Sequence, residues 1–188
     1  FIQDLMDISK KYQHKLLEGA KIAYSGIEGA FANIAAKKIF PDGNLIPYTD
    51  FQSAYEAVES GECDVAVLPI ENSFAGDVGQ VTDLMFTGKL FVNGVYSLPV
   101  TQNLLAVKGA GIEDIKTVIS HPQALDQCAS YIRSKGWETK TASNTARAAK
   151  QIADLNDKSV AAIASAETAE LYGLEVLAEK INENSTNT

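Results

Sequence analysis

The stretch Val65-Ala66-Val67-Leu68-Pro69-Ile70-Glu71-Asn72-Ser73 joins a continuous apolar run to three adjacent polar residues. An uninterrupted run of this kind is typical of a strand that is buried on both faces of a parallel sheet. In open α/β sheets, the carboxyl ends of the strands face the ligand crevice. The stretch therefore predicts that Glu71, Asn72 and Ser73 lie where a small molecule binds. An Asx or Ser turn that caps the next helix would explain the same residues.

Short apolar runs alternate with helical segments on both sides of this stretch. The expected strands are 22–24, 45–48, 65–70, 90–98, 104–107, 117–119, 137–141, 160–164 and 175–177. The expected helices are 29–40, 50–60, 78–86, 122–135, 144–155 and 165–172. Alternation of this kind predicts an α/β fold in which helices cover both faces of parallel sheets.

The segment Leu98-Pro99-Val100-Thr101 separates two runs of alternation and predicts a crossing between two lobes. We expect the first lobe to contain residues 20–98 together with 164–188, and the second to contain residues 99–163. A cleft between two such lobes is a common site for a small molecule. The predicted fold is therefore two α/β lobes with a central cleft, preceded by one helix over residues 1–19.

The composition restricts the classes of function. The chain has 188 residues, of which 46% are hydrophobic and 21% are charged, as is typical of a soluble globular protein. Its net charge of −8 argues against generic nucleic-acid binding, which needs a basic face. No apolar run reaches the roughly 18 residues of a membrane span, and no signal-peptide pattern is visible, so we expect a cytoplasmic protein. The two cysteines and two histidines show no metal-ligand spacing, and we expect no cofactor.

Two further stretches place backbone N–H groups at expected helix starts. Gly26 and Gly29 flank a strand-to-helix turn that could hold an anion, although a plain tight turn uses the same residues. Asn144 and Thr145 begin another helix, with Arg147 beside it; the alternative is an ordinary cap and a solvated arginine. Several helix starts that open towards one cleft would let an acidic protein hold a small anionic ligand.

His121 precedes the helix that is expected over 122–135, and Gln127 lies about one and a half turns along it. A histidine beside a helix start is more often a structural hydrogen-bonding group than a catalyst. Cys128 follows Gln127, but no sequence feature indicates a reactive thiolate, so we do not assign Cys128 as a nucleophile.

Together, these motifs resemble the prephenate dehydratase family from Lys21 to the end of the chain. The matching motifs are Gly26/Gly29/Phe31, Pro69-Ile70-Glu71-Asn72-Ser73 with Gly76, His121-Pro122-Gln123-Ala124-Leu125 with Gln127-Cys128, Asn144-Thr145-Ala146 with Ala148-Ala149, and Ala161-Ala162-Ile163 with Tyr172-Gly173-Leu174. The chain departs from the family pattern where Ile27 replaces a common proline, where Gln102 replaces a common histidine, and near Ala30 and Ala32, where serine or threonine is frequent.

The resemblance implies conversion of prephenate to phenylpyruvate, with loss of CO2 and water, in L-phenylalanine biosynthesis. It implies catalytic roles for Glu71, Asn72, Ser73 and Gln127. The substrate-binding residues that it implies are Gly26, Gly29, Ala30, Phe31, Gly76, His121, Asn144 and Thr145. It also implies a homodimer and a regulatory ACT domain in the full-length protein.

The two ends of the chain carry resemblances of their own. Apolar residues at three- and four-residue spacing over 1–19 predict an amphipathic helix, which resembles the last helix of an AroQ-type chorismate mutase domain through Ser9 and Gln13. A neutral helical leader is the alternative. The family's catalytic domain ends in Asn-x-Thr-Arg-Phe, and its asparagine aligns with Asn187, which places Thr188 at the variable position. An alignment shifted by one residue would make Thr188 the catalytic threonine.

Two other functions fit the predicted architecture. Two α/β lobes with a cleft resemble type II periplasmic binding proteins, so a non-catalytic module that binds a small aromatic acid is one alternative. Arogenate dehydratase, which has the same fold and chemistry, is the other.

Overall fold

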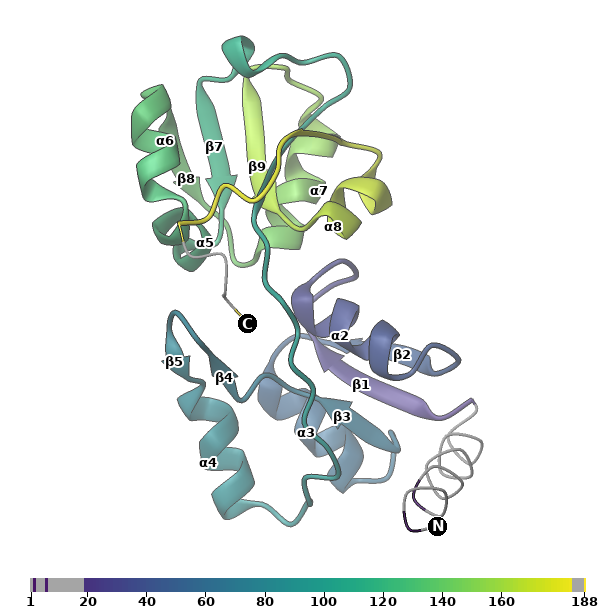
Figure 1. The fold of residues 1–188 in the computed structure, drawn as a ribbon. Helices are drawn as coiled ribbons and strands as arrows, with labels where there is room; N and C mark the ends of the chain where they lie inside the picture. Colours follow the sequence, from purple (N-terminus) through teal and green to yellow (C-terminus); the bar gives the residue numbers. More distant parts are fainter. Residues whose placement is uncertain (1, 3–5, 7–18, 184–187) are drawn as a thin grey trace.

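The computed structural model describes residues 2, 6, 19–183 and 188, and these form two α/β lobes stacked end to end (Figure 1). The two-lobed α/β architecture that the sequence predicts is therefore confirmed. Nearly all of the helix expected over residues 1–19 lies outside the described residues. None of the helices that the structure describes is long and apolar enough to cross a membrane.

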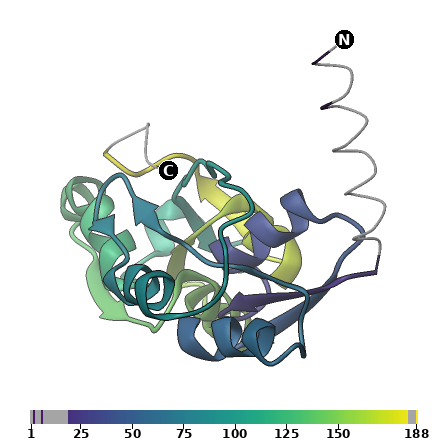
Figure 2. The same ribbon diagram turned by 90° about the horizontal axis from the view of Figure 1, so that it is seen from below.

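The first lobe is built on a three-stranded parallel sheet in the order β2-β1-β3. Its elements are β1 (Lys21–Ser25), α2 (Phe31–Ile39), β2 (Asn44–Tyr48), α3 (Phe51–Glu59), β3 (Val65–Val67), β4 (Glu71–Asn72), β5 (Gly76–Asp77) and α4 (Gly79–Thr87). Side chains alternate along the central strand, so Ile22 and Tyr24 pack with α2 while Ala23 packs with α3. The two helices therefore cover opposite faces of the sheet (Figure 2).

The second lobe is built on a five-stranded sheet in the order β10-β6-β9-β7-β8. Its elements are β6 (Asn103–Ala106), a 3-10 turn (Ile112–Asp114), β7 (Thr117–Ser120), α5 (Pro122–Gln127), α6 (Ala129–Lys135), β8 (Glu138–Thr141), α7 (Thr145–Leu155), β9 (Val160–Ala164), α8 (Ala166–Tyr172) and β10 (Glu175–Ala178). Strands β7, β8 and β9 run parallel, whereas β6 runs antiparallel to β9 and β10. The largest of the three hydrophobic clusters found among the described residues lies in this lobe.

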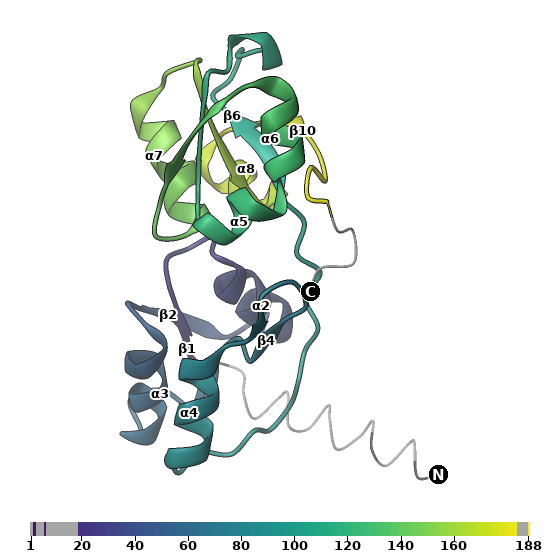
Figure 3. The same ribbon diagram turned by 90° about the vertical axis from the view of Figure 1, so that its left-hand side faces the viewer.

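Each parallel strand of the second lobe leads into a helix at its carboxyl end. These helices are α5, α7 and α8, and they begin at the edge of the lobe that faces the first lobe (Figures 1 and 3). Each start is capped by a side chain that accepts a backbone N–H: His121, Asn144 and Ser165. The fold thus brings three polar helix starts to the junction between the lobes.

Residues 164–188 were expected to return to the first lobe, and this expectation is wrong. Strand β10 pairs antiparallel with β6 in the second lobe, with Glu175 opposite Ala106 and Val176 opposite Leu105. Helix α8 contributes the buried Ala169 to the core of the same lobe. Alternation along the chain indicates parallel neighbours, but it carries no information about a last strand that pairs antiparallel with a distant one.

Three local predictions also differ from the structure. Residues 90–98 form no strand but run exposed along the outside of the first lobe towards the second, with Phe91 89% exposed (Figure 1). Strand β3 ends at Val67 and is only half-buried, because it lies at the edge of its sheet. The helix expected over 122–135 divides at Cys128, whose φ of −112° interrupts the helical geometry between α5 and α6.

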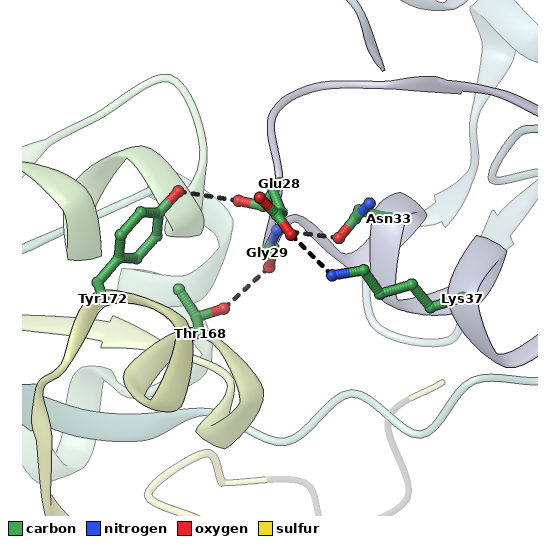
Figure 4. Close-up of polar contacts among 6 residues, drawn as sticks. All are labelled: Glu28, Gly29, Asn33, Lys37, Thr168 and Tyr172. Atoms are coloured by element: carbon green, nitrogen blue, oxygen red, sulfur yellow. Dashed lines mark hydrogen bonds and ion pairs between the residues drawn. The ribbon is translucent and has the colours of Figure 1, made fainter. Parts of the chain in front are cut away.

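Helix α8 joins the two lobes (Figure 4). Thr168 donates its hydroxyl hydrogen to the carbonyl oxygen of Gly29 at 2.9 Å, and Tyr172 donates to the carbonyl oxygen of Glu28 at the same distance. Lys37 pairs with the Glu28 carboxylate at 2.8 Å, within the first lobe. Gly29 has a φ of +85°, and a Cβ there would lie 3.1 Å from a methyl carbon of Leu171, so glycine suits this contact.

The bond from Thr168 to Gly29 is expected to stabilise the folded chain. Thr168→Val keeps the shape of the fully buried side chain but leaves the Gly29 carbonyl oxygen without its donor. We expect the free energy of unfolding in urea to fall by about 1–3 kcal/mol, the usual cost of a buried group that loses its partner. Thr139→Val, at an exposed position in β8, is the matched control. It should change the free energy of unfolding by less than about 0.5 kcal/mol. Equal effects of the two substitutions would contradict this role.

Candidate functional site

The β4–β5 hairpin places Asn72 at the edge of the first lobe. The hairpin pairs Glu71 with Asp77 and Asn72 with Gly76, whose φ of +80° permits the turn. The side-chain oxygen of Asn72 accepts the backbone N–H groups of Phe74 at 3.0 Å and Ala75 at 3.1 Å. This is an Asx turn, as the structural alternative proposed, but it builds a hairpin and does not cap the next helix.

The same oxygen of Asn72 also accepts a hydrogen bond from the second lobe. Gln123, in the first turn of α5, donates its side-chain N–H to Asn72 Oδ1 at 3.2 Å. Asn72 therefore lies at the junction, with its oxygen held by three donors and its NH2 group turned the other way. Gln123 belongs to the recognised sequence motif but was not among the predicted site residues. One feature of the sequence could have indicated Gln123: it lies two residues after His121, the cap of the helix that starts at the junction.

Asn72 and Ser73 also hold the described end of the chain. Asn72 Nδ2 donates to the carbonyl oxygen of Thr188 at 3.2 Å. Ser73 and Thr188 exchange two bonds, from Ser73 N to the Thr188 carbonyl oxygen at 3.1 Å and from Thr188 N to Ser73 Oγ at 2.9 Å. Thr188 therefore lies against the β4–β5 hairpin, although the two are far apart in sequence (Figure 1).

Gln127 lies one turn after Gln123, on the same side of α5. Its side chain is buried, and its Oε1 accepts a hydrogen bond from Gln102 Nε2 at 3.2 Å. Its backbone oxygen accepts the N–H of Glu183 at 2.9 Å, which ties the segment after β10 to this helix. Asn72, Ser73, Gln123, Gln127 and Thr188 form the candidate site, whose side chains are amides and hydroxyls.

His121 caps α5 and thereby positions the residues of its first turn. Its Nδ1 accepts the backbone N–H of Gln123 at 3.3 Å, so the structural interpretation of this histidine is supported. Partial burial lowers the pKa of His121 below its ordinary value of 6.5. The imidazole is therefore neutral at pH 7 and accepts a hydrogen bond.

The other predicted residues lie around the β1–α2 turn and the start of α7. The N–H groups of Gly26, Gly29 and Ala30 already donate to Tyr48 O, Asn33 Oδ1 and Ile27 O, respectively. Phe31 begins α2 and is half-buried. Asn144 caps α7 by accepting the N–H of Arg147 at 2.7 Å, and Thr145 is buried behind it.

An open depression lies where this turn meets α7. It has a volume of about 580 Å³ and is lined by Ile27 from the first lobe and by Arg147, Lys150, Gln151, Asp154 and Leu155 from α7. The predicted residues thus divide into an amide-rich site around Asn72 and a second group around the Gly26–Gly29 turn. Glu71 and Gly76 are exposed on the hairpin.

Residues 22–188 match the sequence profile of the family described as prephenate dehydratase. The chain belongs to the prephenate dehydratase family. It is 42% identical over 167 residues to arogenate dehydratase/prephenate dehydratase 1 of Arabidopsis thaliana, which covers 89% of this chain and 43% of that protein. It is 33% identical over 186 residues to the bifunctional chorismate mutase/prephenate dehydratase of Buchnera aphidicola, which covers 96% of this chain and 48% of that protein. The chain thus spans less than half the length of these curated relatives.

Solved structures of the family share the fold. Prephenate dehydratase from Arthrobacter aurescens, solved with L-Phe, matches with a TM-score of 0.82 and 31% identity over 88% of this chain and 57% of that chain. A protein described as a quorum-quenching acylase, GqqA, matches with a TM-score of 0.80 and 31% identity over 89% of this chain and 61% of that chain. The family fold therefore carries more than one described activity, and the function must be argued from the site.

The partly buried imidazole of His121 predicts a pH dependence of stability. The unfolded chain takes up a proton near pH 6.5, whereas the folded chain resists protonation until the pH falls further. The stability that the folded chain gains from a neutral His121 is therefore complete above pH 6.5 and is lost as the pH falls below 6.5. His121→Asn, which keeps an acceptor for the helix cap, should show a smaller loss of unfolding free energy between pH 7 and pH 5. Identical slopes in urea denaturation would show that His121 does not contribute.

The thiol of Cys128 is expected to be unreactive in the folded chain. Cys128 is fully buried, and burial raises the pKa of its thiol to about 12, so almost no thiolate forms at pH 8. With Cys63→Ser present to isolate it, Cys128 should react with Ellman's reagent only after denaturation in guanidinium. Rapid labelling of the native chain would contradict this expectation and make Cys128 a candidate nucleophile.

Proposed function

We propose that this chain is the catalytic part of a dehydratase that removes water and CO2 from prephenate or from its amino acid analogue, arogenate. Family membership supports the proposal, and the observation that carries it is the arrangement around Asn72. The Asn72 oxygen is held by donors from Phe74, Ala75 and Gln123. Its NH2 group gives one hydrogen to Thr188, which leaves the other for a ligand at the junction of the lobes.

The reaction needs help at the leaving hydroxyl. Aromatisation of the ring supplies the driving force, but hydroxide is a poor leaving group and must depart with a proton or a strong hydrogen bond. A positioned donor typically contributes about 10²–10⁴-fold to such a step. We assign the orientation of the ring and its hydroxyl to Glu71, Asn72 and Ser73, and the binding of a substrate oxygen to Gln127.

The substrate carboxylates need a second set of contacts. We place them towards the start of α7, where Asn144 and Thr145 begin the helix and Arg147 adds a cation at the edge of the depression. The Gly26–Gly29 turn is a weaker candidate, because the N–H groups of Gly26, Gly29 and the following Ala30 already serve the fold. The ring carboxylate should be held loosely, because it loses its charge in the reaction and tight binding of the ground state would not raise the rate.

The full-length protein is proposed to be a cytoplasmic, dimeric fusion of a chorismate mutase and a dehydratase, followed by an ACT domain. The extent of the sequence matches supports the mutase part. The Arabidopsis relative matches 89% of the chain, whereas the bifunctional Buchnera relative matches 96%. The additional matched length fits the resemblance of residues 1–19 to the end of a mutase domain.

Substitution of Asn72 tests the proposed function. Asn72→Asp keeps the oxygen that builds the Asx turn but loses the N–H donor and adds a negative charge opposite an anionic substrate. We expect kcat for phenylpyruvate formation from prephenate to fall about 10²–10³-fold, as when one preorganised donor is removed. The assay should use both this chain and the same chain extended by Thr-Arg-Phe, because Thr188 is held against the hairpin.

The control is Asn93→Asp, which adds the same charge at an exposed position and should leave kcat unchanged. Parallel assays with arogenate, which yields phenylalanine, identify the preferred substrate. Tight binding of phenylpyruvate by calorimetry without turnover of either substrate, in both chain lengths, would favour a non-catalytic binding module. Full activity of Asn72→Asp would remove Asn72 from the site.

A further inference from the structure

Gln102 is a buried polar residue next to the candidate site, and its side chain includes an unpaired oxygen. It lies directly before β6 and is 3% exposed. Within residues 19–183 and 188, its side-chain oxygen Oε1 is the only buried side-chain polar atom without a hydrogen-bond partner. A buried acceptor without a partner is unfavourable, and in native proteins it calls for a specific explanation.

The backbone of Gln102 does not require a glutamine. Its N–H donates to Asn182 Oδ1 at 3.1 Å, and its carbonyl oxygen accepts the N–H of Ile181 at 2.8 Å. Both bonds would form with any residue other than proline. An apolar side chain of similar volume, such as methionine, would also avoid the unpaired oxygen.

The side chain of Gln102 makes one hydrogen bond, and that bond goes to a proposed catalytic residue. Gln102 Nε2 donates to Gln127 Oε1 at 3.2 Å. With its oxygen occupied, Gln127 directs its NH2 group elsewhere, and Nε2 has no partner among the described residues. Gln127 is therefore held as a hydrogen-bond donor, which suits an oxygen of an anionic substrate.

The opposite orientation of the two amides is less favourable. If both were turned over, Gln127 would donate to Gln102 Oε1, and the NH2 group of Gln102 would be buried without an acceptor. An unpaired buried N–H group is rarer in proteins than an under-satisfied carbonyl oxygen. The observed arrangement leaves the less costly group unpaired and presents the donor end of Gln127.

Asn72 and Gln127 differ in how their orientation is fixed. Two backbone N–H groups of its own hairpin hold the oxygen of Asn72, in addition to Gln123. The oxygen of Gln127 is held by Gln102 alone among the described residues. Gln102 is thus the one contact that decides which end of the Gln127 amide faces the ligand.

We propose that Gln102 is a positioning residue that fixes the Gln127 amide so that its NH2 group binds an oxygen of the substrate. This inference rests on the proposed function, because the role of Gln127 does. Gln102 acts through Gln127 and does not itself contact the ligand. Its unpaired oxygen is a stability cost that is kept because its N–H group orients the site.

Gln102→Met tests the proposal, because it keeps the volume of the side chain and removes the donor. We expect kcat/KM to fall by about 10–100-fold, the range found when an outer partner that orients a metal-ligating side chain is removed. The thermal midpoint should change little, because the substitution removes the unpaired oxygen of Gln102 but leaves the buried oxygen of Gln127 without its donor. A residue with a merely structural role would instead lower the thermal midpoint and spare the rate.

A double-mutant cycle separates an effect through Gln127 from an independent one. Gln127→Ala alone should lower kcat/KM, and adding Gln102→Met should cause no further fall, because Gln102 then has nothing left to orient. Gln80→Glu, an exposed substitution in α4, is the control for charge and handling and should leave the rate unchanged. Multiplicative losses in the double variant, or full activity of Gln102→Met, would overturn the proposal.

The orientation can also be read without any turnover, which keeps this inference separable from the proposed function. In 15N spectra, the side-chain NH2 signals of Gln127 are those that disappear in Gln127→Ala. Gln102→Glu offers only acceptors when its carboxyl is ionised, so at a pH above the pKa of that carboxyl it should turn the Gln127 amide and move these signals downfield, whereas Gln102→Met should not. If the wild-type chain converts neither prephenate nor arogenate but this shift appears, the positioning role stands and the assigned reaction fails. Unmoved signals in a folded Gln102→Glu variant would overturn the positioning role; if that variant does not fold, the double-mutant cycle decides.

Discussion

The helix or turn that follows a parallel strand begins at the carboxyl end of that strand. In this protein, the carboxyl ends of the parallel strands in the two lobes face each other. In the second lobe, strands β7, β8 and β9 lead into α5, α7 and α8 at the edge that faces the first lobe. In the first lobe, β1 leads into the Gly26–Gly29 turn, and β3 leads into the hairpin that carries Asn72. The contacts between the lobes and the candidate site both follow from this arrangement, because polar helix starts and turns meet there.

Two contacts make the arrangement specific. Thr168 and Tyr172 at α8 bind the carbonyl oxygens of Gly29 and Glu28, and Gln123 at α5 binds the side chain of Asn72. The first contact is mainly structural, since it uses backbone groups and a buried hydroxyl. The second involves amides that can also bind a ligand. The same junction therefore combines stability with a site.

The proposed site must overcome the negative charge of an acidic chain. To bind the proposed substrate, a dicarboxylic acid, a protein of net charge −8 must supply local positive potential. Here amide N–H groups do so, with their oxygens turned away by other donors, while α7 contributes a helix start and Arg147. Oriented amides retain their direction as the charge on a ligand changes, which suits the proposed reaction, in which one carboxylate leaves as CO2.

The sequence by itself determined most of the local structure and the chemical character of the candidate site. Strand–helix alternation predicted two α/β lobes, Asn144 was predicted at the start of a helix, and the Glu71-Asn72-Ser73 motif was predicted to lie where a ligand binds. These features depend on residues close together in the chain, where patterns of polarity and capping act directly. Only the tertiary structure decided that β10 returns to the second lobe, that residues 90–98 pair with no strand, and that Gln123 and Gln102 hold the site amides. Each of these depends on the pairing of segments distant in sequence, and a hydrogen bond between distant side chains leaves no periodic signal in the chain.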